Sequence, residues 1–183
     1  MDHPALRHSF PRLTLVTGGA RSGKSRLAEA LVRASGLPRT YVATAEAWDH
    51  EMRARIAAHR AGRGEDWHTI EAPRDLPGAL AGAPPGIVLI DCATLWLTNV
   101  VLAEADIASE TEAFLAALDA RIGPVVIVTN ELGWSIVPEN ALARRFRDEQ
   151  GRLNQTLAAR ADLAVAVVAG LPLVLKGQMP VLE

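Results

Sequence analysis

Residues 18–25 constrain this chain most, because they read Gly-Gly-Ala-Arg-Ser-Gly-Lys-Ser and match the phosphate-binding pattern G-x-x-x-x-G-K-[ST]. An apolar run over residues 13–17 precedes them as an expected strand, and residues 24–35 follow with helical spacing. In such a loop, glycines let backbone N–H groups turn onto phosphate oxygens, and the helix N-terminus adds its positive dipole end. The pattern predicts a nucleotide phosphate site in which Lys24 reaches the β- and γ-phosphates and Ser25 ligates Mg²⁺.

The length and charge of the chain limit its organisation and its partners. With 183 residues it is expected to form a single nucleotide-binding domain over residues 13–183, preceded by a flexible tail over residues 1–12. A net charge of −2 gives no reason to expect a nucleic-acid partner. Basic residues do cluster at 53–63 and 144–152, and a small anionic substrate explains these clusters as well as a polymer would.

The cysteine count and the hydropathy of the chain indicate where in the cell the protein is expected and whether it could span a membrane. Cys92 is the only cysteine, so neither an internal disulfide nor a multi-cysteine metal site is possible, and a cytoplasmic location is expected. The most apolar region, residues 163–175, is interrupted by Gly170 and Pro172 and is too short to span a membrane.

Short apolar runs alternate with longer helical patterns, which is typical of βαβ units around a parallel sheet. Strands are expected at 13–17, 40–44, 68–71, 87–91, 125–130 and 163–169, with 173–176 folding back as an antiparallel edge, and helices at 24–35, 49–62, 94–104, 109–121 and 139–160. The runs at 87–90 and 125–128 are wholly apolar, which indicates burial on both faces. The expected fold is α/β: a doubly wound, mostly parallel sheet of the P-loop NTPase type with helices on both faces.

Polar residues end several of these expected strands. They are Thr17, Thr44, Glu71, Asp91 and residues 129–131. Because ligands of doubly wound sheets bind beyond the carboxyl ends of the strands, these side chains are expected to converge on one site.

Asp91 follows the apolar run 87–90, as does the acid that holds Mg²⁺ in P-loop proteins. The alternative is that Asp91 caps the next helix. Cys92 beside it is interpreted as a small buried residue, because no adjacent base would activate its thiol. The motif Asn-Lys-x-Asp, by which switch GTPases read guanine, is not found at residues 129–133, which argues against that class.

The expected helix 49–62 carries a histidine with two possible roles. Met52, Ile56 and His59 share one face, so His59 is either a core residue or a nucleophile. Arg55 and Arg60 flank His59, and their charges would disfavour protonation of the imidazole and leave a nitrogen lone pair free for attack.

Several separate segments together resemble one family, the bifunctional adenosylcobinamide kinase/adenosylcobinamide-phosphate guanylyltransferases of cobalamin synthesis. The resemblance covers residues 13–176, and its segments are 15–25, 41–45, 49–60, 91–99, 128–133, 136–140 and 146–155. It implies two reactions. ATP or GTP phosphorylates the aminopropanol hydroxyl of adenosylcobinamide, and GTP then transfers GMP to the new phosphate through a covalent guanylyl-histidine.

The resemblance also implies roles for individual residues. His59 matches the guanylylated histidine, and Lys24 and Asp91 keep the roles given above. The residues expected to line the nucleotide site are Gly18, Gly19, Ala20, Arg21, Ser22, Gly23, Lys24, Ser25, Ala43, Thr44, Ala45, Arg60, Ala61, Gly62, Arg63, Glu71 and Asp91. Mg²⁺ is the expected cofactor, held by Ser25 and Asp91, and the family is homotrimeric.

Two other functions and one binding question stay open at this point. The chain is alternatively a guanylyltransferase without kinase activity, or a P-loop regulatory ATPase that has no small-molecule acceptor and no use for His59. The residues that bind the corrinoid are not identified by any motif. Trp48, Trp96 and Trp134 are either core residues or surfaces on which the macrocycle packs.

Overall fold

The structure is a computed structural model that describes residues 10–46, 64 and 66–182. Its strands are β1 (Leu13–Gly18), β2 (Arg39–Ala43), β3 (Trp67–Glu71), β4 (Ile87–Asp91), β5 (Val125–Asn130), β6 (Leu163–Val168) and β7 (Leu171–Lys176). Its helices are α1 (Lys24–Ala34), α3 (Leu76–Gly82), α4 (Ala93–Leu102), α5 (Ile107–Ala120) and α6 (Ala141–Arg160). The predicted helix 49–62 and residues 1–9 of the predicted tail lie outside the described residues, so the division into tail and domain stays a prediction.

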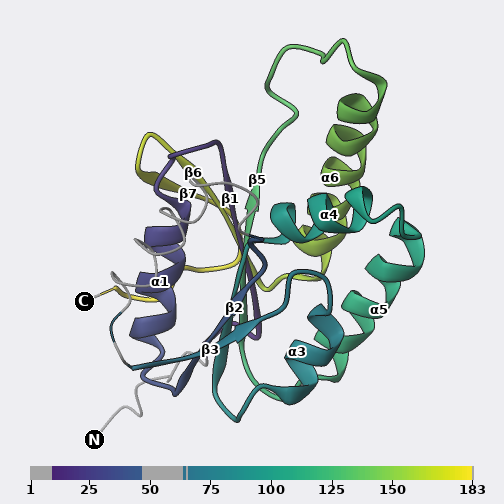
Figure 1. Ribbon diagram of the computed structural model, residues 1–183. Helices are drawn as coiled ribbons and strands as arrows, with labels where there is room; N and C mark the ends of the chain where they lie inside the picture. The colour runs from purple at the N-terminus through teal and green to yellow at the C-terminus, as the bar shows by residue number, and fades with distance from the viewer. Residues whose placement is uncertain (1–9, 47–63, 65, 183) are drawn as a thin grey trace, which may run out of the picture.

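All seven strands form one sheet in the order β3-β2-β4-β5-β1-β6-β7 (Figure 1). Every pairing is parallel except that of β6 with β7, which is antiparallel. The short turn at Ala169 and Gly170 permits this reversal, since parallel neighbours need a longer crossover. The predicted mostly parallel sheet with an antiparallel edge strand is confirmed.

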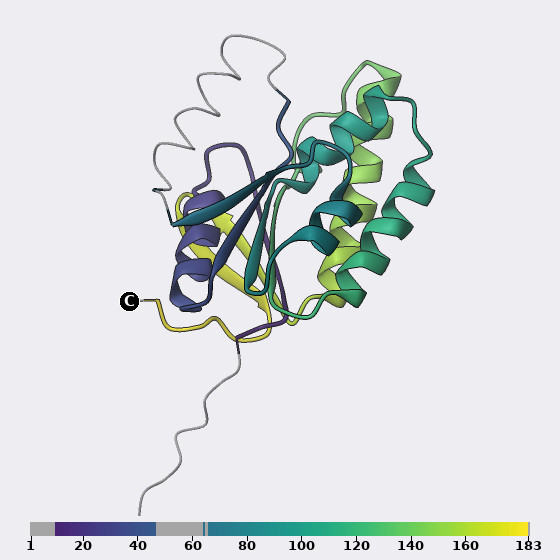
Figure 2. The same ribbon diagram turned by 60° about the horizontal axis from the view of Figure 1, so that its bottom comes forward.

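Helices cover both faces of the sheet. In Figures 1 and 2, α1 lies on one face and α3, α4, α5 and α6 lie on the other. The alternation of side chains along a strand separates two cores: Val16 of β1 packs with Leu31 of α1, while its neighbour Leu15 joins the cluster around Trp96 and Phe114. The wholly apolar runs of β4 and β5 are buried on both sides, as predicted.

Helix α3 is absent from the sequence-based prediction. It spans only Leu76–Gly82 and contains Pro77 and Gly78, so its composition gives a weak helical signal. Two features nevertheless form it. Asp75 caps its first turn, accepting a hydrogen bond from the Gly78 N–H at 2.8 Å, and Leu76 and Leu80 are buried in the core cluster that also contains Phe114 of α5. Elsewhere the observed ends differ from the predicted ones by a few residues, as at α5, which begins at Ile107.

None of the described helices has the length and apolar character needed to cross a membrane.

Candidate functional site

The loop between β1 and α1 is shaped by close backbone contacts. A Cβ atom at Gly18 would lie 2.6 Å from the backbone oxygen of Val167 in β6, so only glycine fits there. The Ser22 carbonyl accepts a hydrogen bond from the Gly170 N–H at 2.9 Å, which joins the loop to the turn between β6 and β7. At Gly19, by contrast, nothing lies within 4 Å of the place that a Cβ atom would take. The loop is therefore constrained by β6 and by the turn between β6 and β7, whereas the space beside Gly19 is open.

The N-terminus of α1 points its backbone N–H groups into this loop. Gly23 caps the helix with φ of 96°, a left-handed conformation that favours glycine, and, because it has no side chain, it makes no side-chain cap hydrogen bond. The Lys24 Nζ donates to the Gly19 carbonyl at 3.0 Å and is largely buried. Because uncapped N–H groups and a buried ammonium meet at one place, this loop has the features of an anion site.

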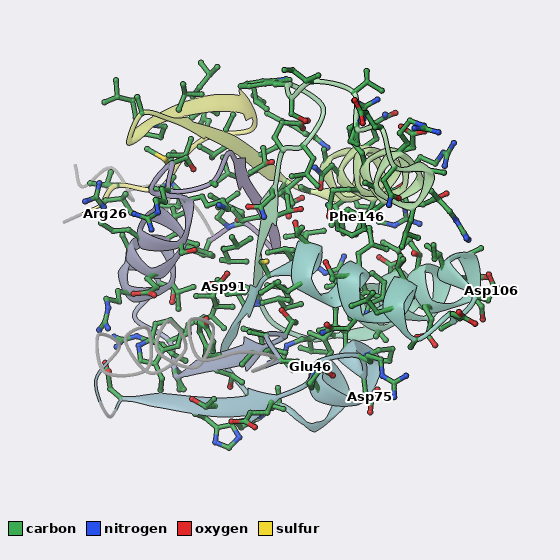
Figure 3. All side chains as sticks on the ribbon, turned by 45° about the horizontal axis from the view of Figure 1, so that its top comes forward. Arg26, Glu46, Asp75, Asp91, Asp106 and Phe146 are labelled. Atoms are coloured by element: carbon green, nitrogen blue, oxygen red, sulfur yellow. The ribbon has the colours of Figure 1, made fainter. Side chains whose placement is uncertain are left out.

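The sheet register aligns the ends of five strands. Gly18 pairs with Asn130, Asp91 with Ala43 in β2, and Ala43 with Glu71 in β3. Figure 3 looks down on this edge and shows Asp91 near its centre, with Glu46 beyond it. Glu71 is exposed on the outermost strand, four inter-strand spacings of about 4.8 Å from β1. The predicted residues therefore form a row along the edge rather than a compact cluster.

Asp91 does not cap the following helix. The N-cap of α4 is Cys92, which makes no side-chain cap hydrogen bond. The Asp91 carboxylate instead accepts a hydrogen bond from the Tyr41 hydroxyl at 3.2 Å, across the neighbouring strand β2. Tyr41 is buried and its ring packs edge-on against Trp67. The capping alternative is therefore wrong, and Asp91 is held at the strand end by a rigid neighbour.

Thr44 and Cys92, two buried residues next to this row of strand ends, are joined by hydrogen bonds. The Thr44 Oγ1 accepts a hydrogen bond from the Cys92 N–H and donates one to the Cys92 carbonyl, each at 2.8 Å. Asn99 donates to the Thr44 carbonyl at 2.8 Å. Burial raises the pKa of the Cys92 thiol to about 11, so it remains protonated near neutral pH. Cys92 is a buried filler, as predicted, and the side chain of Thr44 is engaged inside the protein.

A buried polar network below β5 was missed by the sequence-based prediction. Gln150 of α6 donates through Nε2 to the Thr129 hydroxyl and to Asn154 Oδ1, both at 2.9 Å. Asn154 in turn donates to the Asn130 carbonyl at 3.0 Å, and the Thr94 hydroxyl accepts from the Asn130 N–H at 2.8 Å. These bonds fix the end of β5 beside Gly18. In the sequence, Gln150 and Asn154 of α6 were the residues that could have indicated this network.

The segment that carries the predicted nucleophile lies outside the described residues. His59 and the predicted nucleotide contacts Arg60, Ala61, Gly62 and Arg63 belong to it.

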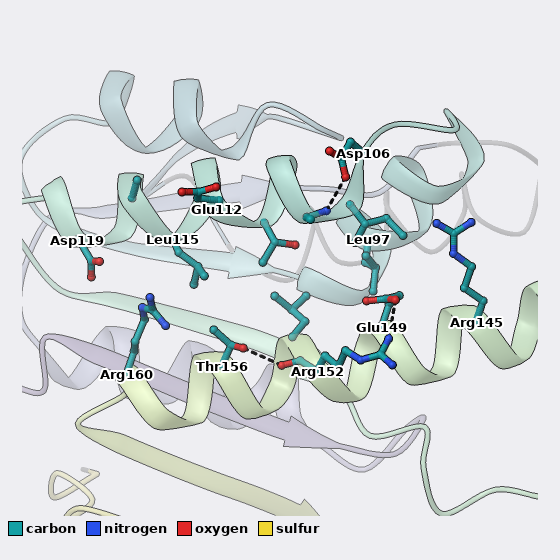
Figure 4. A pocket seen from close by; sticks show the side chains of 15 residues that line it. Leu97, Asp106, Glu112, Leu115, Asp119, Arg145, Glu149, Arg152, Thr156 and Arg160 are labelled. Carbon is teal, nitrogen blue, oxygen red and sulfur yellow. Dashed lines mark hydrogen bonds and ion pairs between the residues drawn. The ribbon is translucent and has the colours of Figure 1, made fainter.

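Two cavities lie away from the phosphate loop. One, of about 570 Å³, runs between α5 and α6, where Asp119 of α5 lies opposite Arg160 of α6 and Arg152 is paired with Glu149 of its own helix (Figure 4). None of the predicted site residues lines it. The other, of about 450 Å³, lies between β3 and α3 and includes Glu71. Of the predicted residues, only Glu71 borders either cavity.

The tryptophans considered for the corrinoid occupy different environments. Trp96 is fully buried in the core and its indole N–H donates to the Arg74 carbonyl at 2.8 Å, so it is a core residue. Trp134, in the loop between β5 and α6, is 78% exposed. Trp48 lies outside the part of the chain that the structure describes.

Comparison with known proteins gives consistent matches over most of the chain. The model of the family described as cobinamide kinase / cobinamide phosphate guanyltransferase matches residues 14–175. The chain is 48% identical over 168 residues to the bifunctional adenosylcobalamin biosynthesis protein CobP of Pseudomonas aeruginosa, covering 90% of this chain and 97% of that protein. It is 43% identical over 182 residues to the bifunctional adenosylcobalamin biosynthesis protein CobU of Salmonella typhimurium, covering 90% and 99%.

Solved structures resemble the chain in fold. The flagellar accessory protein FlaH of Methanocaldococcus jannaschii aligns with a TM-score of 0.51 at 14% identity, covering 92% of this chain and 79% of that one. The RadB recombinase aligns with a TM-score of 0.50 at 18% identity, covering 93% and 84%. At these identities the likeness concerns the fold alone.

Proposed function

The chain belongs to the cobinamide kinase / cobinamide phosphate guanyltransferase family, and we propose that one phosphate site serves both of its transfers. The first transfer phosphorylates the aminopropanol hydroxyl of adenosylcobinamide with ATP or GTP. The second transfers GMP from GTP to the new phosphate and releases pyrophosphate. The observation that carries the proposal is the uncapped N-terminus of α1 with Lys24, in the same strand-end row as Asp91.

In the kinase step, the corrinoid hydroxyl oxygen bonds to the γ-phosphorus while the bond to the β–γ bridging oxygen breaks. The hydroxyl proton leaves to solvent and the nucleoside diphosphate departs. Lys24 and the backbone N–H groups at the start of α1 take up negative charge on the phosphates. We propose that the nucleotide extends from the phosphate loop along the row of strand ends and contacts Ala43, Ala45 and Glu71.

In the guanylyl step, a nitrogen of His59 bonds to the α-phosphorus and pyrophosphate leaves. The phosphate of adenosylcobinamide phosphate then attacks the same phosphorus and displaces the histidine, which gives adenosyl-GDP-cobinamide. Arg55 and Arg60 flank His59 in the sequence and would keep the imidazole uncharged. The contacts proposed for Arg60, Ala61, Gly62 and Arg63 rest, like that of His59, on the family resemblance.

The oxygens near the phosphate loop suit Mg²⁺. Ser25 contributes a hydroxyl and Asp91 a half-buried carboxylate, and the described residues contain no group of three or more acidic, histidine or cysteine side chains that would hold a metal alone. Mg²⁺ commonly takes few protein ligands together with water and substrate phosphates, so this sparse set fits it. When bound, the ion neutralises phosphate charge. Tyr41 orients the carboxylate that would hold it.

The proposal extends to assembly and location. A homotrimer is proposed from the resemblance. The exposed apolar side chains of β7, Leu171, Leu173 and Leu175, support it, because an apolar edge strand is normally covered. A cytoplasmic location and the lack of a nucleic-acid partner are proposed from the single cysteine and the net charge of −2.

A kinase assay with labelled nucleotide tests the first transfer. The protein is incubated with adenosylcobinamide, Mg²⁺ and γ-labelled GTP or ATP, and label is expected on the corrinoid. Unlabelled corrinoid would contradict the kinase assignment and leave the guanylyltransferase alone. If α-labelled GTP also fails to transfer GMP to adenosylcobinamide phosphate, the regulatory ATPase is the better account.

A further inference from the structure

The loop between β5 and α6 displays apolar side chains to solvent. Trp134 is 78% exposed, Ile136 93% and Val137 60%, and Leu142, in the first turn of α6, is 51% exposed. Exposed apolar residues that follow one another in a single loop usually mark a binding surface. We call Trp134, Ile136, Val137 and Leu142 the apolar loop surface.

The base of this loop borders the phosphate loop. The Glu131 N–H, at the base of the loop, donates to the Gly18 carbonyl at 3.1 Å. The loop leaves the sheet at the same edge as the turn between β1 and α1, and rises above it (Figure 1). A molecule that packs on the apolar loop surface therefore lies at the same end of the sheet as the phosphate loop.

The polar groups of the loop are used within the loop, which fixes its shape. The Glu131 carboxylate accepts a hydrogen bond from the Gly133 N–H at 2.7 Å, and the Ser135 hydroxyl donates to the Leu132 carbonyl at 2.9 Å. At the other end, Arg144 donates to the Pro138 carbonyl at 3.0 Å, and Asn140 caps α6. With these polar groups bound internally, the apolar side chains are what the loop offers to a partner.

Charge narrows the kind of partner. Between residues 131 and 142 the chain has two acidic residues, Glu131 and Glu139, and no lysine or arginine. The Arg144 guanidinium of α6 is bound to the loop carbonyls of Pro138 and Glu139. A cobalt(III) corrin that carries a carbon ligand is a broad flat ring with a net positive charge. An indole face attracts both flat ring systems and cations.

We propose that the apolar loop surface binds the corrin ring of the acceptor, with Trp134 packed on the ring. This rests on the proposed function, because that function supplies the corrinoid. Packing the ring here would leave its aminopropanol arm free to reach the phosphate loop, since the loop base contacts Gly18. Trp134 is then a substrate-binding residue for both transfers.

Binding is measured directly, by equilibrium dialysis of adenosylcobinamide followed through its visible absorbance. Trp134→Ala is expected to raise the Kd at least about tenfold, while Trp134→Phe, which keeps an aromatic face, retains most of the affinity. Ile136→Ala is paired with Ile122→Ala, because Ile122 is equally exposed, at 95%, but precedes β5 at the opposite edge of the sheet. Only Ile136→Ala should weaken binding.

Two further readouts separate this inference from the proposed function. Covalent labelling of the protein by α-labelled GTP needs no corrinoid, so it should be unchanged in Trp134→Ala. The inference is overturned if the Kd for the corrinoid is unchanged in Trp134→Ala, or if that variant alters the oligomeric state in size-exclusion chromatography, which would make the loop a subunit contact. Loss of labelling in the wild type would instead contradict the proposed function.

Discussion

Tyr41 and Asp91 are joined across adjacent parallel strands by a hydrogen bond from the phenolic hydroxyl to the carboxylate Oδ2 at 3.2 Å. Tyr41 is itself fixed, because it is buried and packs edge-on against Trp67 at 6.2 Å between ring centroids. The carboxylate at the end of β4 is therefore oriented by a side chain of the neighbouring strand β2.

Tyr41→Phe tests this orientation, since it keeps the ring and removes the hydroxyl. We expect the half-saturating Mg²⁺ concentration of the kinase reaction to rise about three- to tenfold, and the free energy of unfolding to fall by only about 1 kcal/mol. Mn²⁺ binding in the presence of nucleotide, followed by electron paramagnetic resonance, provides a readout independent of activity. An unchanged metal dependence in both measurements would show that Tyr41 does not position Asp91 for a metal.

Gly18 and Gly19 are neighbouring positions of the phosphate loop at which the same substitution, Gly→Ala, is expected to have different effects. A Cβ at Gly18 would approach the Val167 carbonyl oxygen to 2.6 Å, whereas nothing lies within 4 Å of one at Gly19. We expect Gly18→Ala to lower the free energy of unfolding by about 1–3 kcal/mol and Gly19→Ala to leave it nearly unchanged. Denaturant unfolding measures both. Equal losses in the two variants would mean that the contact with β6 does not constrain the loop.

Lys24 is expected to serve both transfers, because both use the same triphosphate. Lys24→Ala should lower kcat/KM of the kinase and the rate of protein guanylylation by at least about 100-fold each. Lys176→Ala is the control, since Lys176 donates to the carbonyls of Ala158 and Ala159, below the sheet edge that carries the phosphate loop. If Lys24→Ala impairs only one transfer, the two reactions do not share one phosphate site.

The Cys92 thiol makes stability depend on pH in the alkaline range. Its folded-state pKa is raised from 9.0 to about 11 by burial, so between these values the unfolded state holds fewer protons than the folded state. The stabilisation is complete below pH 9 and is lost as pH rises toward 11, by up to roughly 3 kcal/mol. Cys92→Ala should remove this part of the pH dependence in denaturant unfolding. An identical pH profile in the variant would contradict the assignment.

Much of the fold could be predicted because burial leaves a clear pattern. The apolar runs at 87–90 and 125–128 predict central strands, and the short turn at Gly170 predicts the antiparallel edge. Helix α3 was missed because its formation depends on the Asp75 cap and on packing, which composition does not show. Local patterns are most reliable where one element is buried over its whole length.

The geometry of the loop at residues 18–25 was predictable, because its glycine and lysine spacing encodes the turn from strand to helix. The site was less predictable where partners come from distant elements. The pairing of Thr44 with Cys92, and of Gln150 with Thr129, joins residues far apart in sequence, and no periodicity indicates such bonds. Likewise, the sequence does not indicate that Asp91 bonds to Tyr41 of the neighbouring strand rather than capping α4.

The central claim is that His59 carries the GMP between GTP and the corrinoid. The protein is incubated with Mg²⁺ and α-labelled GTP, denatured, and examined for label that is acid-labile and base-stable. We expect such label in the wild type and in His68→Ala, whose histidine is exposed on β3, and none in His59→Ala. Label that persists in His59→Ala, or a wild type that is never labelled, would contradict the account.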